Sequence, residues 1–112
     1  MRKDTIEFPD FAKLDIRVGL VKEVTPLENS EKLLKLTVDL GEDYGIVTIL
    51  AGLKAYYSPG DFIGKKFLFA ANLAPRTMAG SVSNGMFLAA DGVERPVLIQ
   101  VADELEPGAR VR

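Results

Sequence analysis

Residues 65–90, KKFLFAANLAPRTMAGSVSNGMFLAA, contain two apolar runs, at positions 67–73 and 86–90. The residues between these runs are mostly Pro, Gly, Ser, Asn and other small or polar types. Short apolar runs bounded by turn-forming residues are typical of buried β-strands. We therefore expect two buried strands joined by a long loop, and we expect the loop to carry the functional chemistry.

The charge of this stretch differs from that of the whole chain. Lys65, Lys66 and Arg76 are its only charged residues, whereas the 112-residue chain has a formal net charge of −2. A locally basic segment is one sign of a phosphate-bearing partner. Composition alone favours the other interpretation, in which three cations lie on an ordinary solvated surface.

Three further strands are expected before this stretch. Apolar residues alternate with polar residues or Gly over residues 14–20 and 34–40, and residues 46–52 form a more continuous apolar run. Alternation with a period of two is typical of half-buried strands. Gly19 stands just before two adjacent apolar residues, so we expect a β-bulge at this point of the first strand.

The remaining segments complete the predicted fold. Residues 53–57 (LKAYY) favour a short helix that ends at the SPG sequence of residues 58–60, and residues 97–101 (VLIQV) favour one more short strand. Five main strands with a short helix between the third and the fourth indicate an all-β fold. We expect a five-stranded Greek-key barrel of the oligonucleotide-binding (OB) type, with N- and C-terminal extensions.

The composition excludes several kinds of chemistry. The chain has no Cys and no His, which removes disulfides, thiolate nucleophiles, the usual zinc ligands and the side chain that titrates nearest to neutral pH. It also has neither a GxSxG turn nor a glycine-rich phosphate-binding loop. We therefore expect a binding protein rather than an enzyme, with no catalytic residues, no metal and no cofactor.

Length and hydropathy point to one domain over residues 1–112. The longest apolar runs fall far short of the roughly 20 residues that span a bilayer, so we expect no membrane partner. The first residues, MRKDTIEFPDF, have a charged start but no apolar core, which a signal peptide requires. We expect a cytoplasmic protein.

Four blocks of the sequence, taken together, resemble a known family. They are DFAKLDIRVGLVKEV, SEKLLKLTVDLG, AGLKAYYSPGDFIGKKFLFAANLAPR and SVSNGMFLAADG, in this order. The sequence resembles the tRNA-binding domain family, which includes the C-terminal domain or separate β subunit of methionyl-tRNA synthetases, free-standing dimeric tRNA-binding proteins and a related secretion chaperone. The resemblance implies an OB fold, tRNA as a partner, and a homodimer in which residues 1–13 and 92–112 form much of the interface.

The resemblance also implies which residues face the RNA, namely Lys32, Lys35, Asn72, Arg76, Ser83, Gly85 and Met86. Cations neutralise phosphates, amide and hydroxyl groups bond to sugars or base edges, a thioether contacts an unstacked base, and Gly allows a close approach of the backbone. Ordinary structural roles also fit. The two lysines can be solvated strand residues, Ser83 can shape a turn, Met86 can belong to the core, and Asn72 can pin the loop.

Three functions are consistent with these observations. The first is a module that recognises tRNA by its shape, alone or in trans with the catalytic subunit of methionyl-tRNA synthetase. The second is an export-related chaperone for extended polypeptides, because residues 46–48 lack a cation that many family members carry and because Tyr56, Tyr57 and Phe62 look exposed. The third is a structural dimerisation domain that binds neither ligand. The SNGM block at residues 83–86 favours the first.

Overall fold

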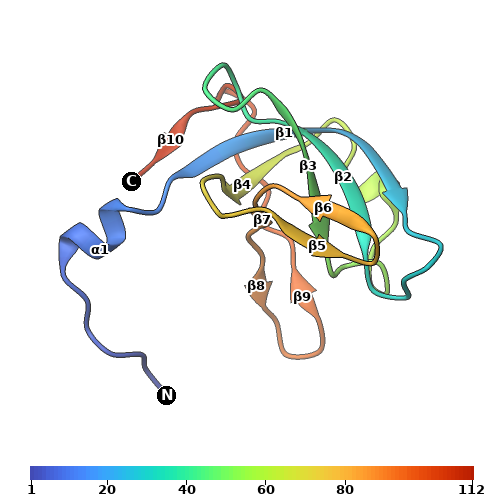
Figure 1. Ribbon diagram of the computed structural model, residues 1–112, viewed down its shortest axis with the longest axis horizontal. Helices are drawn as coiled ribbons and strands as arrows, with labels where there is room; N and C mark the ends of the chain where they lie inside the picture. The colour runs from blue at the N-terminus through green and yellow to red at the C-terminus, as the bar shows by residue number, and fades with distance from the viewer.

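The computed structural model describes residues 1–112, and its centre is an antiparallel sheet that curls into a nearly closed barrel (Figure 1). The five main strands are hydrogen-bonded in the order β3-β2-β1-β4-β7. Their bounds are β1 (Ile16–Pro26), β2 (Leu34–Asp39), β3 (Ile46–Ala51), β4 (Lys66–Ala70) and β7 (Met86–Phe87). The predicted all-β, OB-type barrel is confirmed.

The core fixes which face of each strand points outward. In β2, Leu34, Leu36 and Val38 are fully buried, so the residues between them lie on the outer surface of the barrel. The barrel interior also holds four phenylalanines whose rings pack in tilted and edge-on pairs, with centroids 5.0 to 5.8 Å apart. Because a slip of one residue would turn this apolar set outward, the core specifies the strand register.

The bulge predicted in β1 is present, but at a different residue. The register of β1 against β2 shifts at Lys22, between Val21 and Glu23, so the prediction that placed the bulge at Gly19 was wrong. Gly19 serves close packing instead. A Cβ atom there would lie 2.6 Å from Cγ1 of Val38 and 2.7 Å from the Phe69 ring, so only Gly leaves room for both side chains.

The helix between β3 and β4 also differs from its prediction. Residues 52–56 form turns, and the helical element is the 3-10 helix η1 (Pro59–Asp61). Pro59 therefore begins a helix rather than ending one, which suits its fixed φ and its missing N–H. Ser58 and Asp61 form a capping box, in which the Ser58 backbone N–H donates to Oδ2 of Asp61 over 2.9 Å.

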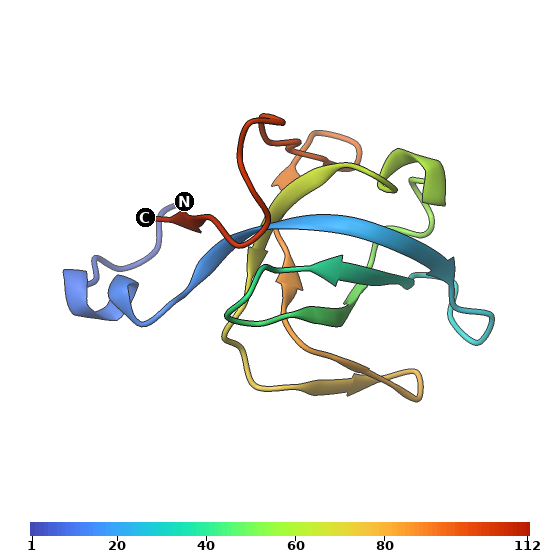
Figure 2. The same cartoon turned by 90° about the horizontal axis from the view of Figure 1, so that it is seen from above.

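The long loop between β4 and β7 contains a hairpin that the sequence did not predict. Its strands are β5 (Arg76–Met78) and β6 (Ser81–Ser83), joined at Ala79 and Gly80. Both turn residues have positive φ angles, 49° and 79°, as in the two-residue turns that connect hairpin strands. The hairpin runs alongside β3, as Figures 1 and 2 show from two directions.

The terminal segments carry the remaining elements. These are α1 (Phe8–Ala12), β8 (Ala90–Asp91), β9 (Pro96–Val97) and β10 (Arg110–Val111). Of the strand predicted over residues 97–101, only Val97 is in a strand, because β9 ends there. Residues 1–13, including α1, project from the barrel on the side where β10 pairs with β1 (Figure 2). None of the helices has the length and hydropathy needed to cross a bilayer.

Candidate nucleic-acid interface

Lys35 lies on the outer face of the barrel, in the middle of the sheet. Its sequence neighbours Leu34 and Leu36 are buried, so the alternation of β2 points its side chain outward. In the sheet it lies between Thr25 of β1 and Leu50 of β3. The structure therefore places a half-exposed cation where β2 and β3 meet, which is the surface that OB-fold proteins use for oligonucleotides.

Ser83 attaches the β5–β6 hairpin to the free edge of β3. Its hydroxyl accepts a hydrogen bond from the Leu50 N–H over 2.9 Å and donates one to the Gly85 carbonyl over 3.1 Å. The backbone N–H of Asn84 donates to the Thr48 carbonyl over 2.8 Å. Ser83 is only 3% exposed, so its hydroxyl supports the hairpin from inside the protein.

Arg76 and Met86 lie on either side of this attachment. Arg76 is exposed and pairs with Ser83 across the hairpin. Met86, at the start of β7, is 49% exposed and shares a shallow apolar pocket of about 130 Å³ with Leu50. Gly85 has a φ of +134°, and a Cβ atom there would lie 2.9 Å from the Ala70 carbonyl oxygen. Only Gly allows the chain to pass this close to β4.

The loop between β1 and β2 presents Lys32, which is exposed. Lys54, in the turn that follows β3, holds this loop in place by hydrogen bonds. Its ammonium donates to the carbonyls of Leu27 and Ser30, the latter over 2.7 Å, and its backbone N–H donates to the Lys32 carbonyl over 3.0 Å. Ser30 adds a further constraint, because its hydroxyl accepts bonds from the N–H groups of Lys32 and Leu33, both over 3.2 Å.

Lys32 in the β1–β2 loop, Lys35 in β2 and Arg76 in β5 are the three predicted cations, and we call these three residues the basic rim. Its three members are residues that the resemblance implied, whereas Lys54, which positions the loop that carries Lys32, was not predicted from the sequence. No pattern near Lys54 could have revealed this role, because its acceptors are the carbonyls of residues more than 20 positions away.

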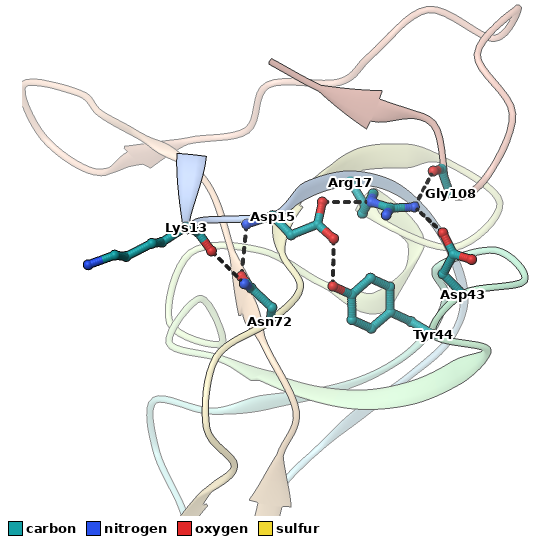
Figure 3. Close-up of polar contacts among 7 residues, drawn as sticks. All are labelled: Lys13, Asp15, Arg17, Asp43, Tyr44, Asn72 and Gly108. Carbon is teal, nitrogen blue, oxygen red and sulfur yellow. Dashed lines mark hydrogen bonds and ion pairs between the residues drawn. The ribbon is translucent and has the colours of Figure 1, made fainter. Parts of the chain in front are cut away.

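Asn72 has a different environment from the basic rim. Its Nδ2 donates to the Lys13 carbonyl over 2.7 Å, and its Oδ1 accepts a bond from the Asp15 N–H over 2.8 Å (Figure 3). Both halves of the amide are therefore used by the backbone that leads into β1. Asn72 fixes the point at which residues 1–13 leave the barrel, which agrees with the pinning role left open from the sequence.

A buried arginine lies next to Asn72 and was not singled out from the sequence. Nε of Arg17 donates to Asp15 over 2.7 Å, and its Nη1 donates to Asp43 and to the Gly108 carbonyl, each over 3.0 Å (Figure 3). The bond from Arg17 is the main reason why the pKa of the Asp15 carboxyl is lowered. The pKa of Tyr44 is raised, because its hydroxyl donates to Asp15 over 2.6 Å.

These observations define the class of protein. The protein is an OB-type barrel that carries cations on β2, on the β1–β2 loop and on the β5–β6 hairpin. Hydrogen bonds attach that loop and that hairpin to the rest of the protein. These features define a small binding domain suited to nucleic acid. Residues 16–110 match the model of the family described as the putative tRNA binding domain, and the chain belongs to this family.

Individual relatives agree with this assignment. The methionine--tRNA ligase of Pyrococcus abyssi is 44% identical over 107 residues, which are 96% of this chain and 14% of that enzyme. The MetRS related protein from Pyrococcus horikoshii is 35% identical with a TM-score of 0.91, covering 98% of this chain and 100% of that one. The CsaA chaperone protein from Picrophilus torridus is 30% identical with a TM-score of 0.87, covering 96% and 100%. The chain therefore spans about a seventh of the ligase and the whole of two small structures.

Proposed function

We propose that this chain is a non-catalytic domain that binds tRNA through the basic rim. The observation that supports this most is the connection across β3. Lys35 lies opposite Leu50, the Leu50 N–H is bonded to Ser83, and Ser83 pairs with Arg76. These contacts connect the backbone of Lys35 in β2 to that of Arg76 in the hairpin. Cations carried by connected strands suit a folded RNA, whose phosphates lie at set distances from one another.

The other residues of the site contribute in different ways. Met86 and the apolar pocket beside Leu50 offer a contact for one unstacked base. Ser83 and Gly85 act through the backbone they shape, and Asn72 acts by fixing the segment before β1. Because most of these contacts go to phosphates and not to base edges, we expect recognition of tRNA shape with low sequence specificity.

The relatives suggest a setting for this activity. The chain is similar to part of methionine--tRNA ligases and to a MetRS related protein over its full length. We infer that it serves as an accessory tRNA-binding domain for a methionyl-tRNA synthetase in the cytoplasm, supplying affinity for tRNA while the catalytic subunit supplies the chemistry.

We further propose that the domain is a homodimer formed by residues 1–13 and 92–112. Phe8 and Phe11 of α1 are 75% and 40% exposed. They border an open pocket of about 580 Å³ between α1 and β10. Two exposed phenylalanines on a five-residue helix present apolar surface, which the same segments of a second copy would cover.

A gel-shift titration with total tRNA at two salt concentrations tests the proposed function, with a regular RNA duplex as the control. We expect a complex with tRNA that weakens at the higher salt concentration, and a weaker complex with the duplex. Equal affinity for tRNA and duplex would remove the claim of shape recognition, and the absence of any complex would remove the function.

One observation favours a second function, binding of unfolded polypeptides, namely the likeness to the CsaA chaperone protein. The aromatic residues expected to form its surface support it less than the sequence suggested. Phe62 is fully buried in the core, and the hydroxyl of Tyr57 donates to the Pro96 carbonyl, so Tyr56 is the exposed one. Binding of a denatured polypeptide that excess tRNA does not reduce would favour the chaperone. Binding of neither ligand would leave a structural dimerisation domain.

A further inference from the structure

The tip of the β5–β6 hairpin is attached to the rest of the protein by one hydrogen bond. Nδ2 of Asn29, in the loop between β1 and β2, donates to the Ala79 carbonyl over 2.8 Å. The other bonds from the hairpin segment to the barrel are at its base, through Ser83 and Asn84. Figures 1 and 2 both show the tip ending near the β1–β2 loop. Asn29 therefore connects the two loops that border the candidate interface.

The backbone at this contact has an unusual conformation. Ala79 is the only residue other than Gly with a positive φ, at 49°. The left-handed region is unfavourable for an L-residue with a Cβ atom. The turn is thus held in a shape that Ala disfavours, and its carbonyl in that shape accepts the bond from Asn29.

The loop that carries Asn29 is itself well anchored. The Lys54 ammonium holds the carbonyls of Leu27 and Ser30, which flank Asn29, and the Ser30 hydroxyl accepts two backbone bonds from the following residues. Asn29 therefore lies in a loop that several hydrogen bonds hold in place. The hairpin tip has only this one hydrogen bond to the rest of the protein, so we expect it to open more readily than the loop.

We propose that Asn29 is a positioning residue for RNA binding, which sets the distance between Arg76 on the hairpin and the two lysines of the basic rim. This inference rests on the proposed function. Asn29 carries no charge, and it acts by holding the hairpin in place before RNA arrives. Without it, the hairpin must be ordered during binding, and the cost of that ordering weakens the complex.

The first test compares Asn29→Ala, Arg76→Ala and the double variant in the full chain, by titration with total tRNA over a range of KCl concentrations. We expect Asn29→Ala to weaken binding about three- to tenfold, the worth of one hydrogen bond. We expect the slope of log affinity against log salt to fall by up to about one unit, as if a cation had been removed. The double variant should bind no more weakly than Arg76→Ala, because both changes remove the same contribution.

Gln100→Ala is the matched control, because Gln100 is an exposed amide with no side-chain hydrogen bond, and we expect it to change neither affinity nor slope. If Arg76→Ala weakens binding while Asn29→Ala leaves affinity and slope unchanged, the positioning role is wrong and the proposed function stands. Additive losses in the double variant also contradict it. If the unaltered protein binds no tRNA, both proposals fail.

A second measurement does not depend on RNA. Amide hydrogen exchange of the free protein should become faster at residues 77–82 in Asn29→Ala, with the core strands unchanged. Unchanged exchange at the hairpin would overturn the inference even if affinity fell, because the hairpin would then be held by something else.

Discussion

The guanidinium of Arg17 joins segments that are far apart in the sequence. It donates hydrogen bonds to Asp15 just before β1, to Asp43 in the turn between β2 and β3, and to the carbonyl of Gly108 before β10. Its side chain is 11% exposed. Only Arg offers several donors in one plane for this arrangement, and Lys could not replace it.

Replacing Arg17 by Met should destabilise the protein. The Arg17→Met substitution keeps most of the apolar stem but leaves the Asp15 carboxylate without its cation and the Gly108 carbonyl without its donor. We expect a loss of about 2 to 4 kcal/mol in the free energy of unfolding, measured in urea. The control is Arg95→Met, because Arg95 is exposed and only stacks over Tyr57 at 5.1 Å. An equal, small loss in both variants would mean that the Arg17 network is not stabilising.

The same network predicts how stability depends on pH. The folded-state pKa of Asp15 lies below its ordinary value of 3.8. Its contribution is therefore complete above the ordinary pKa and is lost as the pH falls through the lowered folded value, that is, below about pH 4. Asp15→Asn should be less stable at neutral pH and should lose less stability on acidification. Unfolding curves at several pH values test this, and Asp103→Asn, on an exposed loop, should match the unaltered protein. If Asp15→Asn lost as much stability on acidification as the unaltered protein does, the stabilising role of the Asp15 carboxylate would be contradicted.

Among the secondary-structure elements, the β5–β6 hairpin closes the gap that β3 and β7 leave in the barrel. It does so with the Ser83 hydroxyl and the Asn84 N–H, which satisfy backbone groups at the free edge of β3. An unprotected edge strand would invite pairing with other chains. The same bonds of Ser83 and Asn84 therefore protect the edge of the sheet and hold the hairpin that carries Arg76.

Ser83→Ala tests this attachment. The substitution leaves the buried Leu50 N–H without an acceptor, which should cost about 1 to 3 kcal/mol of folding free energy. It should also weaken tRNA binding indirectly, by loosening the hairpin. Ser81→Ala, in the same strand and without a side-chain hydrogen bond, is the matched control for a thermal or urea melt. A stable Ser83→Ala protein with weak tRNA binding would instead point to direct contact of the hydroxyl with RNA.

These elements also show how far the sequence could predict the structure. The alternation from Leu34 to Leu40 and the apolar run of β4 identified their strands, because burial on one face imposes a period of two. The hairpin has two three-residue strands with little alternation, so no pattern revealed it. The bonds of Lys54 and Asn29 link residues that only the fold brings together. Local patterns carry no information about such tertiary contacts, so neither residue could be found from the sequence.

For the molecule as a whole, the proposed dimer accounts for the exposed N-terminal segment. We expect the protein to sediment as a dimer and Phe8→Ser to shift it toward the monomer at micromolar concentration, because Phe8 presents apolar surface to a partner. Phe8 is exposed within one chain, so the substitution should leave the melting temperature of the monomer unchanged. Ile63→Ser, at an exposed apolar residue outside residues 1–13 and 92–112, is the control. A monomeric unaltered protein would contradict the dimer.

The salt dependence of tRNA affinity for the unaltered protein, Lys35→Ala, Arg76→Ala and Lys65→Ala tests the basic rim most directly. Lys65 precedes β4 and is separated from β2 by β1, so it is a cation of the same protein outside the rim. We expect Lys35→Ala and Arg76→Ala each to lose on the order of 1 kcal/mol or more of binding free energy and about one unit of salt slope, with Lys65→Ala unchanged. Equal losses at all three positions, or none at any, would show that RNA binding does not depend on the rim.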